Sequence, residues 1–93
     1  MIRSFANRAT ERFFKDDVCR SQWQEFRSVA ARKLDMIDAA TKVEDLLSPP
    51  GNRLEGLKGD RKGQWSIRIN RQWRICFHWT KDGPADVEIV DYH

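Results

Sequence analysis

The sequence has no long apolar run and only a few cysteine and histidine residues. No stretch approaches the length that a bilayer span requires, so we expect no contact with a membrane. Residues 1–5 are not followed by the apolar stretch of a signal peptide. The two cysteines, Cys19 and Cys76, are far apart and form no CxxC pair, which favours reduced thiols in the cytoplasm. The whole chain contains only two cysteines and two histidines, so we do not expect a structural zinc site.

Acidic residues are scarce in the middle of the chain. Residues 51–82 contain 8 basic and 3 acidic residues, whereas residues 1–50 contain 9 and 8. The positive charge is therefore concentrated between Arg53 and Lys81, where aromatic residues lie among the basic ones. Such a block is typical of a protein that binds a polyanion, most often nucleic acid. On composition alone, a solvated charged face is an equally good interpretation.

Length and composition predict a single domain over residues 1–93. A chain of 93 residues can enclose one hydrophobic core, and 40% hydrophobic with 33% charged residues is the composition of a globular protein. A break in the secondary structure is expected at Pro49–Gly51, because two prolines and a glycine cannot continue a helix.

The half before this break has the pattern of helices, apart from a short strand expected at Ile2–Phe5. A first helix is expected near residues 10–14, with Thr10 as its N-cap. A longer helix is expected after Ser21, its N-cap, because apolar positions recur at spacings of three and four. These positions are Phe26, Val29, Ala30, Lys33, Leu34 and Ile37. Thr41 and Glu44 form a capping-box pattern, which predicts one more short turn.

After the break the apolar period changes from about 3.6 to 2, which predicts strands. Residues 64–70 and 72–80 alternate between apolar and polar side chains, with a tight turn at Asn70-Arg71. A turn at residues 82–84 leads into a third strand at Ala85–Val90. The expected fold class is α+β, a small twisted antiparallel β-sheet with the N-terminal helices packed on its apolar face. The apolar face carries Trp65, Ile67, Ile69, Trp73, Ile75, Phe77 and Trp79.

The other face of this sheet gathers reactive side chains. Alternation places Arg74 on it, Tyr92 follows two residues after Val90, and the loop before the sheet brings Glu55 and Lys58 to its edge. With His93, this set suits cleavage of RNA by its own 2′-OH, which needs a base, an acid and fixed cations at the phosphate. The candidate cations are Lys58 and Arg74, and the candidates for proton transfer are Glu55, Tyr92 and His93. DNA lacks the 2′-OH and would not be cut.

Several motifs occur together in a specific order. They are "SPPGNRLE" at the break, "LKGDRKGQWSI" before the sheet, "WRICF" within it and "DYH" at residues 91–93. In this order they resemble the HigB branch of the RelE superfamily of bacterial toxins, most of all its GraT-type members. The resemblance extends from Ile2 to His93.

The resemblance implies a ribosome-dependent endoribonuclease that enters the ribosomal A site and cuts mRNA without a metal or other cofactor. It also implies a cognate HigA-type helix-turn-helix antitoxin, which blocks the toxin and binds operator DNA, so the toxin reaches DNA only through its antitoxin. The basic block then predicts contacts with RNA and the ribosome. The residues expected to make them are Arg53, Arg61, Lys62, Arg68 and Arg71.

The family's site residues match this sequence by position, with one exception. The matching residues are Lys58, Arg74, Asp91, Tyr92 and His93. Glu55 stands where well-studied members have a histidine. Three interpretations of Glu55 stay open: it acts as the general base, it only orients the substrate, or it marks a slower enzyme.

Two other functions stay open at this point. A non-catalytic binder of nucleic acid would explain the basic block but not the Tyr92–His93 pair. A relative that has lost its activity would act only as a co-repressor with its antitoxin.

Overall fold

Helices come first along the chain and strands second, in a computed structural model that describes residues 1–92. The helices are α1 (Arg8–Asp16) and α2 (Arg27–Ala39). The strands are β1 (Glu55–Gly56), β2 (Gln64–Arg68), β3 (Trp73–Thr80) and β4 (Gly83–Asp91). Short 3-10 helices connect them: η1 (Ser21–Phe26), η2 (Val43–Leu47), η3 (Pro50–Asn52) and η4 (Gly59–Arg61).

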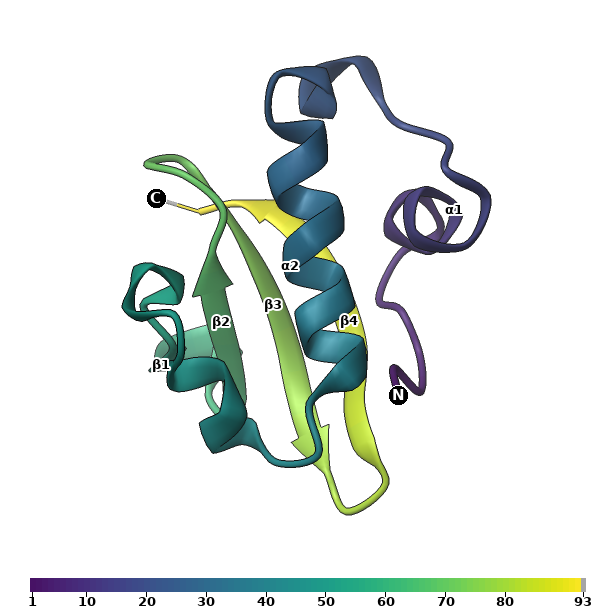
Figure 1. Ribbon diagram of the computed structural model, residues 1–93. Coiled ribbons are helices and arrows are strands. Elements are labelled where there is room, and N and C mark those ends of the chain that lie inside the picture. Colours follow the sequence, from purple (N-terminus) through teal and green to yellow (C-terminus); the bar gives the residue numbers. More distant parts are fainter. Residues whose placement is uncertain (93) are drawn as a thin grey trace.

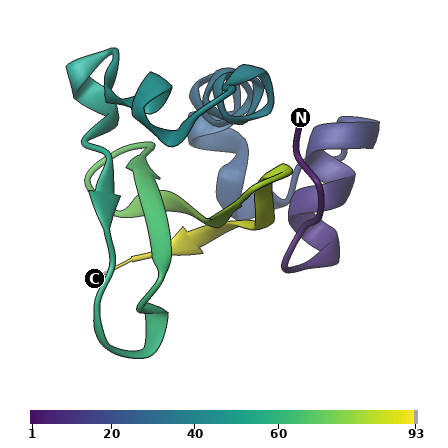
Figure 2. The same cartoon turned by 90° about the horizontal axis from the view of Figure 1, so that it is seen from below.

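The four strands form one antiparallel sheet in the order β1-β2-β3-β4. Helix α2 lies across one face of this sheet, and α1 lies beside its β4 edge (Figure 1). Seen from below, the sheet is twisted, and α2 and the short helices η2 and η3 that follow it lie on the same side of the sheet (Figure 2). The predicted α+β class with helices on one face is confirmed.

The core lies between α2 and the apolar face of the sheet. Leu34 and Ile37 of α2 have no exposed surface, and neither do Ile67, Ile75 and Phe77 of the sheet. The three alternating tryptophans of the sheet are half-buried and pack on this core, as their period-two spacing predicts. The opposite face of the sheet is therefore free to carry polar side chains.

Both predicted helix starts need correction. Helix α1 begins earlier than expected, and its N-cap is Asn7, whose side chain accepts a hydrogen bond from the Thr10 N–H at 2.8 Å. Thr10 is buried instead, and its hydroxyl accepts from the Ile89 N–H at 3.1 Å. Ser21 starts the 3-10 helix η1, not an α-helix, and α2 follows from Arg27.

Three local predictions also differ from the structure. After Thr41 the short turn forms, but its acidic partner is Asp45, which accepts from the Thr41 N–H at 2.9 Å. Residues 2–5 make only an isolated parallel bridge, Phe5 to Val87, and no regular strand. The last strand is irregular beside this segment, because Asp86 has a φ of 52° and the register with β3 shifts. That strand begins at Gly83, earlier than predicted.

Candidate active site

The polar face of the sheet is organised in rows across β2, β3 and β4. Ser66 pairs with Cys76, which pairs with Glu88, and the next row along β2 pairs Arg68 with Arg74. Directly paired residues of antiparallel strands share a face, so these side chains are neighbours. The period-two alternation of the sequence therefore predicted this face correctly.

Arg74 is held at the centre of the polar face by two hydrogen bonds. Its Nε donates to the Ser66 hydroxyl at 2.8 Å, and its Nη2 donates to the Arg53 carbonyl at 2.7 Å. Only 14% of its side chain is exposed, whereas a surface arginine would be mostly in solvent. Both anchors are uncharged, and the ion-pair partner that the described residues provide for this guanidinium is the exposed carboxylate of Glu55.

Two of the predicted catalytic residues surround this guanidinium. The Glu55 carboxylate lies 3.8 Å from Arg74 Nη2, and the Tyr92 ring centre lies 5.9 Å from the guanidinium carbon. The main chain of Tyr92 donates to the Gln72 carbonyl at 2.9 Å, so the segment after β4 is docked on the β2–β3 loop. The structure thus brings Glu55, Arg74 and Tyr92 together. His93 lies outside the described residues.

Lys58 stands at the other end of β2, in the loop that follows β1. The Leu57 N–H donates to the Gln64 carbonyl at 2.8 Å, which fixes this loop against the start of β2. Lys58 itself is exposed and caps η4, where its carbonyl accepts from the Arg61 N–H at 3.3 Å. Its ammonium is therefore accessible to a ligand that crosses the polar face.

Arg61 is part of the sheet's structure and not a free surface charge. Its guanidinium donates to the Glu88 carboxylate at 2.9 Å and to the Gln64 side chain at 3.0 Å. The hydrogen bond to Glu88 raises the pKa of Arg61 further above its usual value. Cys76 is fully buried beside this pair, and burial raises the pKa of its thiol. The charge of Arg61 is therefore balanced by Glu88.

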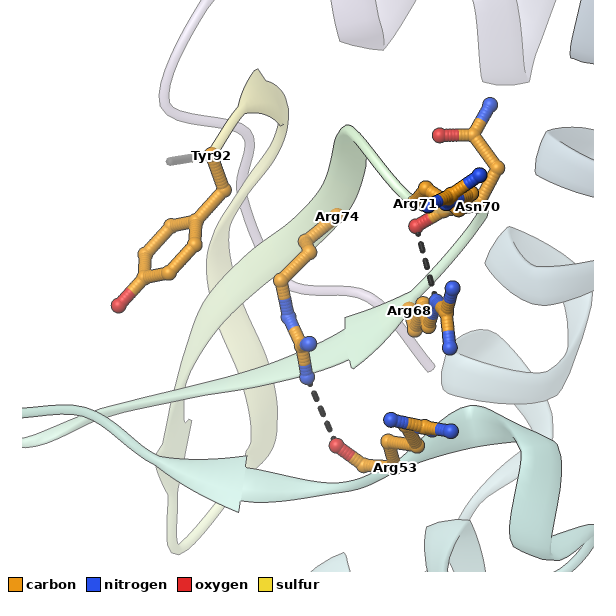
Figure 3. Close-up of a pocket in the computed structure, with 6 residues that line it drawn as sticks. All are labelled: Arg53, Arg68, Asn70, Arg71, Arg74 and Tyr92. Carbon is orange, nitrogen blue, oxygen red and sulfur yellow. Dashed lines mark hydrogen bonds between the residues drawn. The ribbon is translucent and has the colours of Figure 1, made fainter.

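The opposite end of the polar face is strongly basic. An open pocket of about 320 Å³ lies there, with side chains on two sides of it (Figure 3). Its lining residues are Arg53, Arg68, Asn70, Arg71, Arg74 and Tyr92. Within the part of the chain that the structure describes, no carboxylate lines this pocket. We call it the arginine pocket.

Ser66 and Asn70 support the site but were not among the predicted residues. Ser66 has no exposed surface and holds Arg74. The Asn70 side chain accepts from the Gln72 and Trp73 N–H groups at 2.9 and 2.8 Å, which shapes the β2–β3 loop. Alternation could have placed Ser66 opposite Cys76 and beside Arg74, but only a fixed register shows that the two side chains bond.

Within residues 1–92, no three His, Cys, Asp or Glu side chains cluster in a way that could hold a metal ion. No helix in the described chain has the length and apolarity to cross a membrane.

Comparison with known proteins identifies the family of this chain. Residues 3–93 match the family model of HigB-like toxins, described as the RelE-like toxin of the type II toxin–antitoxin system HigB. The chain belongs to the HigB-like toxin family. The match covers every described residue of the site, from Arg53 to Tyr92.

Two named relatives of this HigB-like chain are similar to it over its whole length. It is 40% identical over 94 residues to the toxin HigB-1 of Vibrio cholerae, a match that covers 100% of this chain and 98% of that toxin. It is 31% identical over 93 residues to the endoribonuclease HigB of Proteus vulgaris, which covers all of both chains. A protein of Haemophilus influenzae with no described function is 47% identical over 54 residues, 58% of this chain and 54% of its own.

Proposed function

We propose that the protein is the toxin of a type II toxin–antitoxin pair and acts as a ribosome-dependent endoribonuclease on mRNA in the ribosomal A site. Membership of the HigB-like family and a full-length relative named as an endoribonuclease support this. One observation carries the chemistry. The Arg74 guanidinium is fixed by neutral partners between a carboxylate and a phenol.

The proposed reaction is an attack of the 2′-OH on its neighbouring phosphate. Glu55 takes the 2′-OH proton, the 2′-oxygen bonds to phosphorus, and the bond from phosphorus to the 5′-oxygen breaks. His93 gives its proton to that 5′-oxygen, which leaves a 2′,3′-cyclic phosphate and a 5′-OH end. Arg74 and Lys58 stabilise the charge that gathers on the phosphate oxygens. Tyr92 positions the RNA strand beside Arg74. In this proposal the protein's side chains carry the reaction without a metal ion.

The proposed partners follow from the family. A type II toxin implies a cognate antitoxin, and we propose a HigA-type helix-turn-helix protein that acts with the toxin in the cytoplasm and carries the contact with operator DNA. A closer relation to GraT-type toxins stays a prediction from the sequence motifs.

Translation of a defined message on purified ribosomes tests this function. Messenger 5′ ends are mapped with and without the protein, and a sample without ribosomes serves as the control. We expect fragments with 5′-OH ends at A-site codons only when ribosomes are present. An intact message after incubation with folded protein would contradict the proposal and leave the binding or co-repressor functions.

A further inference from the structure

The arginine pocket lies one step along β2 from the residues that hold Arg74. Alternate residues of a strand face the same side, so Ser66 and Arg68 share the polar face. Two residues at about 3.4 Å each place Arg68 roughly 7 Å beyond Ser66 along the strand. Arg74 pairs directly with Arg68 and bonds to Ser66, and its side chain therefore forms the boundary between the two positions.

Contacts within the protein hold part of the pocket's lining in place. Arg68 donates its Nε–H to the Asn70 carbonyl at 3.0 Å, which leaves the two terminal nitrogens of its guanidinium for another partner. The Arg53 main chain, with a φ of 47°, is tied to Arg74 through its carbonyl. In Figure 3, Arg53, Arg68 and Arg71 lie on one side of the pocket, and Arg74 and Tyr92 lie on the other.

The charges on the polar face are divided unevenly between its two ends. Glu88 balances Arg61 at one end. The lining of the arginine pocket combines four guanidinium groups with no carboxylate in the described residues, and the Glu55 carboxylate, outside the lining, lies 3.8 Å from one of them, Arg74. Like charges that line one pocket repel one another, and an anion between them relieves the repulsion. The planar donor fork of arginine matches the oxygens of a phosphate group.

We propose that the arginine pocket binds the phosphate adjacent to the scissile phosphate of the substrate RNA, through Arg53, Arg68 and Arg71. The inference rests on the proposed function, which places the scissile phosphate at Arg74. A single strand that crosses Arg74 carries its next phosphate toward Arg68. The pocket reads the RNA backbone and not the bases, and the substrate must therefore carry charged phosphates on two successive linkages.

Neutral linkages in the message test this subsite. We would prepare messages in which the phosphate on the 5′ side, or on the 3′ side, of the cleaved linkage is a methylphosphonate. With the wild-type protein, one of the two should raise KM on the order of tenfold, the effect of losing a charge-assisted hydrogen bond, and leave kcat nearly unchanged. Arg68→Gln should raise KM similarly on the normal message, and the same methylphosphonate should then add nothing.

Arg32→Gln is the matched control, because Arg32 is exposed on α2, in the layer that covers the other face of the sheet. It should keep the wild-type KM. Circular dichroism melting of each variant checks that it is folded. If wild-type protein cleaves both methylphosphonate messages normally and Arg68→Gln also has the wild-type KM, the subsite is refuted while the proposed function stands.

If no cleavage occurs on ribosomes, the binding of RNA to the protein alone still tests the phosphate site. Fluorescence anisotropy would follow a labelled 2′-O-methyl RNA, which cannot be cut, as the salt concentration rises. The slope of log K against log salt should be smaller by about one in Arg68→Gln than in the wild type, the effect of one lost phosphate contact. Equal slopes for the two proteins would overturn the phosphate site whatever the outcome on ribosomes.

Discussion

At the scale of single residues, the central feature is a cation whose position is set before any substrate arrives. Arg74 is mostly buried, and its two anchors, Ser66 and the Arg53 carbonyl, accept hydrogen bonds without adding negative charge. A fixed donor that needs no rearrangement stabilises developing charge more effectively than a mobile one. The groups that hold the guanidinium are therefore different from the carboxylate that faces its charge, Glu55 at 3.8 Å.

Arg74 and Ser66 should therefore affect the reaction in different ways. Arg74→Ala should slow the cleavage step by the equivalent of about 2–4 kcal/mol, since it removes a charge-stabilising donor. Ser66→Ala keeps the charge but releases Nε, so kcat should fall roughly 10–10²-fold through misplacement. Single-turnover kinetics on programmed ribosomes measure both values. A Ser66→Ala protein with wild-type kcat would show that Ser66 does not position Arg74.

Residue-scale sequence patterns predicted one part of this site and missed another. The positions of Arg74, Glu55 and Tyr92 followed from alternation and from the order of the motifs. The pair of Arg61 with Glu88 could not be predicted in this way. Its members are 27 residues apart in sequence, and they meet only when the folded chain places η4 beside β4. Arg61 was expected to contact RNA, and its balanced charge makes Lys62, which is exposed, the better candidate of the two.

At the scale of elements, helix α1 and the β2–β3 loop together fix β4, the strand that leads to Tyr92. Thr10 of α1 accepts from the Ile89 N–H, and the Tyr92 N–H donates to the Gln72 carbonyl. The N-terminal segment adds parallel contacts on the outer edge, where the Val87 N–H donates to the Ser4 carbonyl at 3.1 Å. Sequence patterns placed Thr10 at the helix start because threonine is a common N-cap, and tertiary contact with β4 decided otherwise.

Thr10→Val tests the attachment of α1 to β4. Valine has nearly the shape of threonine but leaves the Ile89 N–H without an acceptor in a buried position, so unfolding should become easier by about 1–3 kcal/mol. Thermal denaturation measures the change. Thr41→Val is the control, because Thr41 is exposed and water replaces its hydroxyl contact. Equal stability losses in the two variants would mean that the Thr10–Ile89 bond does not tie the helix to the strand.

At the scale of the whole molecule, a buried lysine joins helix α2 to the segment that leads into the sheet. Lys33 of α2 is 7% exposed, and its ammonium donates to the Asn52 side-chain carbonyl in η3. Asn52 in turn donates to the Leu46 carbonyl at 3.2 Å. These two hydrogen bonds hold the segment that leads to Arg53. Lys33 appeared in the sequence as one position of the apolar stripe, and the structure explains that place by its buried polar partner.

This buried lysine should make stability depend on pH in the alkaline range. Burial, with a smaller contribution from the charge of Arg32, lowers the pKa of Lys33 below 10.5 in the folded protein. Between the lowered pKa and 10.5 the unfolded chain binds more protons than the folded one, so the contribution of Lys33 to the free energy of unfolding rises with pH. Cys76 acts in the opposite direction, because its raised pKa lowers stability as pH passes 9.0.

Comparison with Lys33→Met separates the two effects, because both proteins keep Cys76. Urea denaturation at a series of pH values gives the free energy of unfolding of each protein. The wild-type value minus the Lys33→Met value should increase as pH rises from neutral toward 10.5. Above 10.5 the difference should level off, since the amine is then neutral in both the folded and the unfolded state. A difference that stays constant over this range would mean that the ammonium of Lys33 is solvated in the folded protein and that burial does not shift its pKa.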